Sequence, residues 1–312
     1  MPKAPALTTA TACSNALTGM ADSGWHVGAC RARNAIDPVG YSLPAITQLA
    51  EACVTPIDLS ELMVPERRWH SVTLGQVDLD VLGHLKSHCF DDAPVTDESG
   101  LPCAVVSTSD IEVSFTSGSP FTTESQELKR SFVPLSCPAE RLLDTLGQHR
   151  AALVHGDGSE GVVGLVTISD LNKHAFRAQI YPKIARLEQR LADLIDEHFE
   201  DPWEWLPHLG EAKSGVVGHW EVLRKEGLDV SATSGATLLQ LLTVIGSTEQ
   251  LRKKLGFKSA KEFGELKGRM PRLRNAVMHP ARPVVESRNL IENLKSSIMA
   301  LDTLWNATDG AF

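Results

Sequence analysis

Several features that mark common protein classes are missing from this sequence. It contains no apolar run near the roughly 18 residues that a membrane-spanning helix needs. Its N-terminus lacks the charged-then-apolar order of a secretory signal. None of its six cysteines belongs to a CxxC pair, so nothing indicates a zinc ribbon or a redox motif. These absences predict a cytoplasmic protein with reduced thiols and no membrane partner.

A sustained hydrophobic period is also missing from residues 1–43, which predicts a disordered or irregular tail. Its first 35 residues are rich in Ala, Thr and Ser, which loosely resembles a transit peptide; a start at Met20 is the other interpretation. In residues 44–58 we expect a short helix and a lead-in. The helix would run from Leu43 to Cys53, behind Ser42 as its cap, and a turn would cover 55–58.

Charge is unevenly distributed along the chain. The net charge of −9 lies in residues 1–179, whereas residues 180–312 balance 18 basic against 18 acidic residues. Within that second part, residues 250–295 hold 12 Lys and Arg against 4 Asp and Glu, a local charge of +8. The overall acidity argues against a general nucleic-acid coating protein. The basic segment suits a phosphate-bearing ligand, although a solvated helix face explains it equally well.

Residues 59–179 contain an internal repeat of strand, helix, strand, strand and helix. The two copies end alike, because PCAVVSTSDI and VGLVTISDL both run from a buried strand into a hydroxyl residue, two residues, and Asp at a helix start. Gly/Asp-rich turns, DESG and GDGSEG, connect the last two strands of each copy. The first copy is predicted to have its helix at Val77–His88 and strands at Ala93–Thr96 and Pro102–Ser107; the second has its helix at Pro138–Gln148 and strands at Ala151–His155 and Val162–Thr167.

This repeat resembles a tandem CBS-domain pair, whose members generally bind adenine nucleotides (ATP, ADP or AMP) in clefts between the paired domains. The resemblance implies that Ser107 and Thr167 bind phosphate with the helix N-terminus, and that Asp110 and Asp170 accept hydrogen bonds from ribose. The second copy fits the family better, since Pro102-Cys103 stands where the family often has glycine. Ordinary helix capping is the alternative explanation for all four side chains.

Residues 180–312 show helical periodicity almost throughout and predict an all-α antiparallel bundle. Trp203 and Trp205 are expected in a loop. Pro182 is expected near the first turn of the opening helix. The later helices are expected at Glu211–Glu226, Ala236–Ile245, Ser247–Leu255, Ser259–Met270, Arg272–Met278 and Ser287–Asn306.

The segment RLRNAVMHP, Arg272–Pro280, places Arg274, Asn275 and His279 at the end of one of these helices. Pro280 ends the helix and pushes His279 out of the α region, at the negative pole of the dipole. The segment resembles the Arg-x4-His motif of the HEPN superfamily. That resemblance implies a metal-independent endoribonuclease that dimerises, of the kind found in toxin–antitoxin and phage-defence systems.

In that interpretation RNA supplies its own 2′-hydroxyl nucleophile, so no metal is required. His279 would be the acid/base, Arg274 would stabilise the phosphate charge, and Asn275 would orient one of them. A homodimer would supply a second histidine, and an antitoxin protein is a further expected partner. Three alternatives stay open. In the first, Arg274 pairs with a carboxylate while His279 caps the helix, and in the second the chain is a non-catalytic nucleotide sensor. In the third, His84, His88 and Cys89 bind a metal, although a partly buried helix face explains these three residues more simply.

Overall fold

The computed structural model describes residues 55–73, 79–117, 131–156, 158 and 161–311. All of them belong to one of the chain's two units, the one that begins at Cys53. The expected tail at residues 1–43 and the expected helix at Leu43–Cys53 lie outside the described residues. None of the helices in the described ranges is long and apolar enough to cross a membrane.

The first copy of the repeat forms a three-stranded sheet in the order β3-β4-β5. β3 pairs with β4 in parallel and β4 with β5 in antiparallel, as expected when a helix joins the first pair and a hairpin the second. Eight buried residues form its own small core. Its elements are β3 (Val72–Thr73), α3 (Leu79–Ser87), β4 (Asp92–Thr96), β5 (Pro102–Ser107) and α4 (Thr108–Ser117).

The second copy repeats this topology, with β6 parallel to β8 and β8 antiparallel to β9. The internal repeat predicted from the sequence is therefore confirmed by strand pairing. The copy contains β6 (Phe132–Pro134), α5 (Ala139–His149), β8 (Ala151–His155), β9 (Val162–Thr167), the 3-10 helix η2 (Ile168–Asn172) and α6 (His174–His198). A small apolar cluster of Val105, Ala151, Leu153 and Leu165 joins the two copies.

Two short strands at the start of the described chain pair with the second copy. β2 (Val64–Pro65) adds to the edge of β9, opposite Leu165 and Gly164. A Cβ at Gly164 would come within 2.2 Å of the Met63 sulfur and 2.9 Å of the Met63 Cβ, so any side chain there would displace Met63. β1 (Pro56–Asp58) pairs with β7 (Ser136–Pro138). The turn expected at 55–58 was therefore wrong, because those residues find a strand partner about 80 positions away.

The first hairpin turn shows how local sequence fixes local structure. The Asp97 carboxylate accepts hydrogen bonds from the amides of Ser99 and Leu101, at 2.9 and 3.0 Å. Gly100 follows with φ of +81°, a left-handed conformation that glycine adopts at little cost. The Ser99 hydroxyl and these backbone donors hold the pKa of Asp97 below its ordinary value.

α6 continues from the second copy directly into the helical region. It begins at His174, and Pro182 lies well inside its 25 residues rather than in the first turn as predicted. Eight of its residues, from Phe176 to Ile195, are buried, and this packing on both sides of Pro182 offsets the missing N–H bond. The boundary predicted between residues 179 and 180 falls inside this helix.

The C-terminal region is mostly helical, as predicted. Ser259–Met270 and Arg272–Met278 were expected as separate helices, but they form one helix, α11, with Pro271 inside; Met270 and Leu273, buried on either side, hold it together. The expected loop at Trp203 contains a short helix that buries Trp205. The elements are α7 (Pro202–Trp205), η3 (Leu206–Ala212), α8 (Lys213–Lys225), η4 (Ala232–Gly235), α9 (Leu238–Ser247), α10 (Glu249–Lys254), α11 (Ala260–Met278), η5 (Arg288–Leu290) and α12 (Ile291–Asp309).

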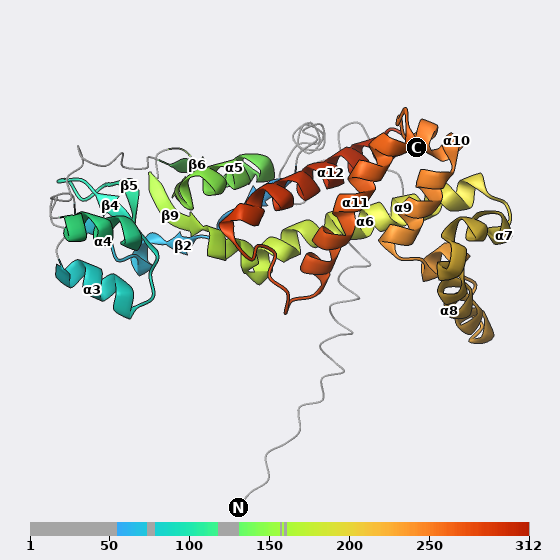
Figure 1. The fold of residues 1–312 in the computed structure, drawn as a ribbon, viewed down its shortest axis with the longest axis horizontal. Helices are drawn as coiled ribbons and strands as arrows, with labels where there is room; N and C mark the ends of the chain where they lie inside the picture. Colours follow the sequence, from blue (N-terminus) through green and yellow to red (C-terminus); the bar gives the residue numbers. More distant parts are fainter. Residues whose placement is uncertain (1–54, 74–78, 118–130, 157, 159–160, 312) are drawn as a thin grey trace, which may run out of the picture. The chain divides into compact units, whose positions relative to one another are not determined.

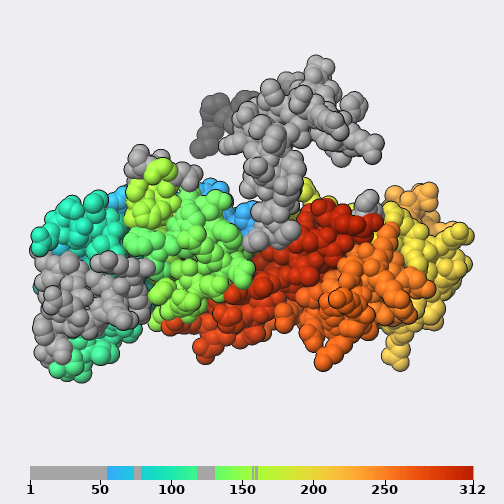
Figure 2. Space-filling model, turned by 90° about the horizontal axis from the view of Figure 1, so that it is seen from above, coloured from blue at the N-terminus to red at the C-terminus, as the bar shows by residue number. Residues whose placement is uncertain are grey.

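The second copy and the helical region share one hydrophobic core. Leu142 and Leu146 of α5, Ile184 of α6 and Ile298 of α12 all belong to the same buried cluster. Figure 1 shows α12 beside α5 and α11, and Figure 2 shows the surface of the second copy adjoining that of the C-terminal helices. The second copy is thus built into the helical region, whereas the first copy has a core of its own.

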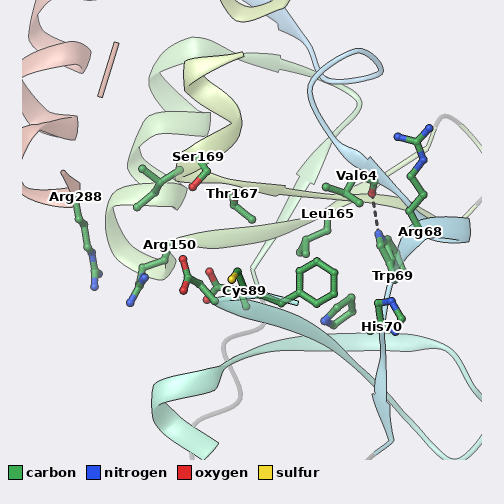
Figure 3. Close-up of a pocket in the computed structure, with 15 residues that line it drawn as sticks. Val64, Arg68, Trp69, His70, Cys89, Arg150, Leu165, Thr167, Ser169 and Arg288 are labelled. Carbon is green, nitrogen blue, oxygen red and sulfur yellow. Dashed lines mark hydrogen bonds between the residues drawn. The ribbon is translucent and has the colours of Figure 1, made fainter. Parts of the chain in front are cut away.

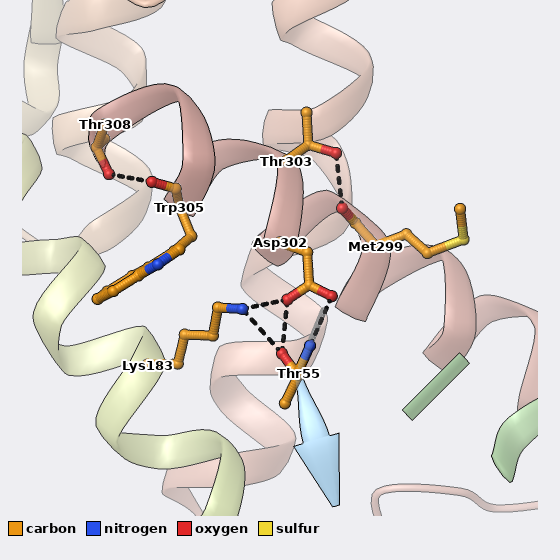
Figure 4. Close-up of polar contacts among 7 residues, drawn as sticks. All are labelled: Thr55, Lys183, Met299, Asp302, Thr303, Trp305 and Thr308. Atoms are coloured by element: carbon orange, nitrogen blue, oxygen red, sulfur yellow. Dashed lines mark hydrogen bonds and ion pairs between the residues drawn. The ribbon is translucent and has the colours of Figure 1, made fainter. Parts of the chain in front are cut away.

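A buried polar cluster fixes the start of the described chain to this core (Figure 4). The Asp302 carboxylate on α12 accepts hydrogen bonds from the amide and hydroxyl of Thr55, at 3.1 and 2.6 Å. It also forms an ion pair with Lys183 on α6. Three segments distant in sequence are tied at one carboxylate. Removing a single partner would leave a buried group unsatisfied.

Candidate functional site

A cavity of about 510 Å³ lies between the two copies of the repeat (Figure 3). Its volume falls in the range usual for sites that bind small molecules. Both copies and the helical region contribute to its walls. The residues that line it include Arg68, Trp69, His70, Cys89, Phe90, Asp91, Asp92, Arg150, Thr167, Ser169 and Arg288.

The turn that ends the second copy forms one wall of this cavity. Thr167 and Ser169 line it, and Ser169 is exposed there. Asp170 does not line it: its buried carboxylate accepts hydrogen bonds from the Thr167 amide and hydroxyl, at 2.6 and 2.9 Å, and pairs with Lys173 at 2.7 Å. This is a capping box, the alternative left open by the sequence. In the structure Asp170 positions Thr167, while the ribose contact expected of Asp170 stays a prediction.

The equivalent turn of the first copy does not reach this cavity. The Ser107 hydroxyl is buried, accepts the Asp110 amide at 3.0 Å and lies 2.8 Å from the Ser109 hydroxyl. Neither Ser107 nor Asp110 is among the residues that line the cavity. The structure therefore brings only Thr167 of the four predicted ligand-binding residues to this cavity.

Two residues in unusual backbone conformations border the cavity. Cys89 and Arg150 are the only residues other than glycine with positive φ in the described ranges, at +56° and +65°. Each follows the helix of its copy, α3 or α5, and each lines the cavity. Left-handed conformations of this kind cost free energy and occur more often at functional sites. Each copy therefore contributes one strained residue to the wall of the same cavity.

The charged groups of the cavity are mainly arginines. Arg68, Arg150 and Arg288 line it together with two carboxylates, Asp91 and Asp92. None of the three arginines makes an ion pair with any residue that the structure describes. Guanidinium groups without a carboxylate partner are suited to bind phosphate or carboxylate oxygens in pairs.

In the view of Figure 3, Trp69 and His70 lie near Arg68, at the other end of the cavity from Arg150 and Arg288. Trp69 is held by a 2.8 Å hydrogen bond from its indole N–H to the Val64 carbonyl. His70 and Phe90 also line the cavity, and their rings are 5.3 Å apart. Rings in this arrangement can stack on a purine, whereas the arginines suit anionic groups.

Sequence reasoning did not identify the residues that supply most of this lining. Trp69, Phe90, Arg150 and Arg288 belong to four separate segments, and no local motif marks any of them. Only the helix-end position of Arg150, directly before a buried strand, could have drawn notice.

The Arg274 motif lies elsewhere, at the end of α11. The helix ends at Met278, and His279 is exposed in an extended conformation, as Pro280 predicts. The Arg274 Nε lies 3.5 Å from Glu188 on α6, in an ion pair without a hydrogen bond. Asn275 is half-buried, and its carbonyl accepts the His279 amide at 3.1 Å. The ion pair is the arrangement that the alternative interpretation of Arg274 expects.

Three histidines cluster on the first copy. His84 Nε2 lies 2.9 Å from His70 Nδ1, and the rings of His84 and His88 are 4.2 Å apart. Loss of hydration, and then the charges of His88 and His70 when protonated, hold the pKa of His84 below its ordinary value. Within the described ranges, no group of three or more His, Cys, Asp or Glu residues is arranged to hold a metal ion.

No known family model matches the chain, and no curated protein matches it. Solved structures of CBS-domain proteins match its N-terminal part. The CBS domain of a bacterial CNNM/CorC family Mg²⁺ transporter in complex with ATP is 24% identical, covers 41% of this chain and 89% of its own, and has a TM-score of 0.32. CbpB in complex with c-di-AMP is 16% identical, covers 45% and 96%, and has a TM-score of 0.33. A hemolysin-like CBS-domain protein of Oenococcus oeni PSU is 17% identical, covers 40% and 93%, and has a TM-score of 0.32. TM-scores at this level do not establish a common fold.

Proposed function

We propose that this protein is a regulatory nucleotide sensor that binds an adenine nucleotide between the two copies of its repeat. The observation that carries the proposal is the 510 Å³ cavity, with rings at one end and arginines without ion pairs among the described residues. The purine would stack on Trp69 and Phe90, and the phosphates would lie against the arginines. Asp91 supplies acceptors for ribose or amino hydrogens. The CBS resemblance of the repeat supports this choice of ligand.

The experiment blocks the cavity at Ser169, an exposed lining residue whose side chain makes no hydrogen bond to a residue that the structure describes. ATP, ADP and AMP are titrated calorimetrically, and the melting temperature is followed. The wild-type protein should gain about 2.7 kcal/mol of stability at a ligand concentration a hundred times Kd. Ser169→Trp should abolish both binding and the shift, because an indole occupies the space.

The matched control is Ser109→Trp, which places the same side chain at the equivalent position of the first copy, outside the cavity. Ser109→Trp should bind one nucleotide per chain with the same affinity as the wild-type protein. Binding lost in Ser109→Trp and kept in Ser169→Trp would move the site to the first copy, near Ser107 and Asp110. Absence of binding by the wild-type protein to all three nucleotides would end the proposal.

The exposed position of His279 supports a second candidate, a metal-independent endoribonuclease that acts as a homodimer. Its motif stands in the basic segment and on a long helix. The Glu188 ion pair weighs against it, since Arg274 would have to leave that partner to bind phosphate. RNA, an antitoxin partner and a role in toxin–antitoxin or phage-defence systems rest on the HEPN resemblance alone.

The test measures RNA cleavage in EDTA and the molar mass in solution. Cleavage by a wild-type dimer, lost in His279→Ala and increased in Glu188→Gln, would support this candidate. Equal activity in wild-type and His279→Ala would remove it, and the regulatory function would stand alone.

A further inference from the structure

We propose that Arg288, which belongs to the helical region, binds the phosphate groups of the ligand and so makes the nucleotide a clamp between the second copy and α12. This inference rests on the proposed function and concerns the regulation of the same cavity. Arg288 is the cavity residue that lies farthest along the chain, in η5 just before α12. The site would be incomplete without the helical region.

The hydrogen bonds of Arg288 leave part of its guanidinium group available. Its Nε donates to the Gly147 carbonyl at 2.9 Å, and Nη2 donates to the Gln148 carbonyl at 2.7 Å. Both carbonyls belong to the last turn of α5, where the helix dipole is negative. The N–H groups of Nη1 have no partner among the described residues. One edge of the planar group is thus fixed by α5, while the side chain lines the cavity.

Arg150 provides the second cation at this place. It follows the last residue of α5 directly, and its left-handed backbone is held by hydrogen bonds from its own amide to Leu146 and from Ile168 to its carbonyl. In the view of Figure 3, Arg150 and Arg288 lie at the same end of the cavity, away from Trp69 and His70. Two guanidinium groups without ion pairs to described residues favour an anion with several oxygens, as in a di- or triphosphate, over a neutral nucleoside.

The segment that leads to Arg288 is bound to the second copy by the half-buried side chain of Asn172. The Asn172 amide oxygen accepts the amides of Val284 and Val285, at 2.7 and 2.9 Å, and its nitrogen donates to the Val285 carbonyl at 2.9 Å. Asn172 ends the turn that begins at Thr167 in the cavity wall. The cavity and this segment therefore share one hydrogen-bonded turn.

Buried Arg177 holds the same segment further back. It donates to the carbonyls of Ala276 and Arg282, the latter at 2.7 Å, so it spans both sides of His279. On α12, Lys295 pairs with Asp144 of α5 at 2.6 Å. A ligand bound to Arg288 therefore acts on residues 279–288, a segment that begins at the Arg274 motif. Both ends of this segment are held by the contacts described above.

The experiment compares Arg288→Gln with Lys295→Gln in the full chain. Each change removes a contact of α5, with η5 for Arg288 and with α12 for Lys295, and should lower the ligand-free melting temperature, but Lys295 does not line the cavity. Arg288→Gln should weaken ATP binding by about 10- to 100-fold, the loss expected for a charge-assisted contact, and leave adenosine binding unchanged. Lys295→Gln should bind ATP as the wild-type protein does. Arg288→Lys keeps the charge without the planar group and should lie between them.

Hydrogen exchange of residues 279–287 tests the clamp itself. ATP should slow exchange there in the wild-type protein and in Lys295→Gln, and should have no effect in Arg288→Gln. Wild-type affinity for ATP in Arg288→Gln would overturn the inference and leave the proposed function intact. Weaker affinity with unchanged exchange in the wild-type protein would overturn the clamp. A wild-type protein that binds no adenine nucleotide would instead be a failure of the proposed function.

Discussion

The two copies of the repeat share a topology and differ in what surrounds them. The first copy encloses eight buried residues in a core of its own, between α3, α4 and its sheet. The second copy, which ends in α6, shares its core with α11 and α12. Its final turn caps η2 and leads within a few residues into the long helix α6, whereas the first copy's final turn leads into the short helix α4. The same chain pattern therefore serves as an attached module in one place and as part of a larger core in the other.

This difference has a consequence for regulation. A ligand between the copies contacts the first copy, which has a core of its own, and the second copy, whose core is continuous with the C-terminal helices. The turn that holds Thr167 and Ser169 is hydrogen-bonded through Asn172 to Val284 and Val285, whereas no described residue of the first copy makes such a contact with the 279–288 segment. A signal from the cavity to the helices should run through the second copy.

The largest expected difference concerns the two cores. Leu85 in α3 and Leu146 in α5 are both fully buried leucines, one in each core. Replacement of either with Ala should cost about 2–5 kcal/mol of local stability. Leu146→Ala should lower the urea concentration at the midpoint of the main unfolding transition of the whole unit. Leu85→Ala should lower the urea concentration at which the first copy alone unfolds. Hydrogen exchange resolved by peptide distinguishes the two. A shared loss of protection in both variants would show that the cores unfold together.

A smaller difference is expected at the ends of the two equivalent turns. Asn172 makes three hydrogen bonds to Val284 and Val285, while the aligned residue of the first copy, Glu112, makes an exposed ion pair with Lys86. Asn172→Ala should cost about 1–3 kcal/mol, because it leaves buried amides without a partner. Glu112→Ala should cost less than about 1 kcal/mol. Urea unfolding measures both, and equal losses would contradict the central role of the second turn.

The repeat could be predicted from the sequence because its evidence is local and occurs twice. Val-rich strands, Gly/Asp turns and the Ser/Thr-x-x-Asp endings each depend on neighbouring residues. The strand at 56–58 was missed because its partner at 136–138 is far away. The continuity of α11 through Pro271 was missed because tertiary packing of Met270 and Leu273 outweighs a local cost of roughly 3 kcal/mol.

The site was harder to predict than the fold. Thr167 was found because it stands in a recognisable turn, but the direction of the Asp170 side chain depends on Lys173 and on burial. The partner of Arg274 is Glu188 on another helix, which no spacing rule supplies. Arg288 comes into the cavity through contacts with the carbonyls of Gly147 and Gln148, about 140 residues earlier. Residues joined by the fold alone leave no pattern in the chain.

The smallest expected effect uses the histidine cluster, which the first copy has and the second lacks. The pKa of His84 is lowered in the folded protein from its ordinary value of about 6.5. The folded state therefore binds a proton less readily than the unfolded chain does. The resulting stability is fully present above the unfolded pKa and is lost as pH falls through the folded pKa. Unfolding of the first copy should become easier between about pH 7 and pH 5, while the second copy changes less.

Hydrogen exchange of α3 and α5, the corresponding helices of the two copies, at several pH values checks this difference within one sample. His84→Gln should flatten the pH dependence in α3, because the imidazole whose pKa is lowered in the folded protein is then absent. His155→Gln on β8 removes an imidazole outside the cluster and serves as the control. An unchanged slope in His84→Gln would show that the cluster does not set the acid sensitivity of the first copy. A slope equally steep in α5 would mean that acid acts on the second copy as well, and the two copies would then differ in connection but not in response.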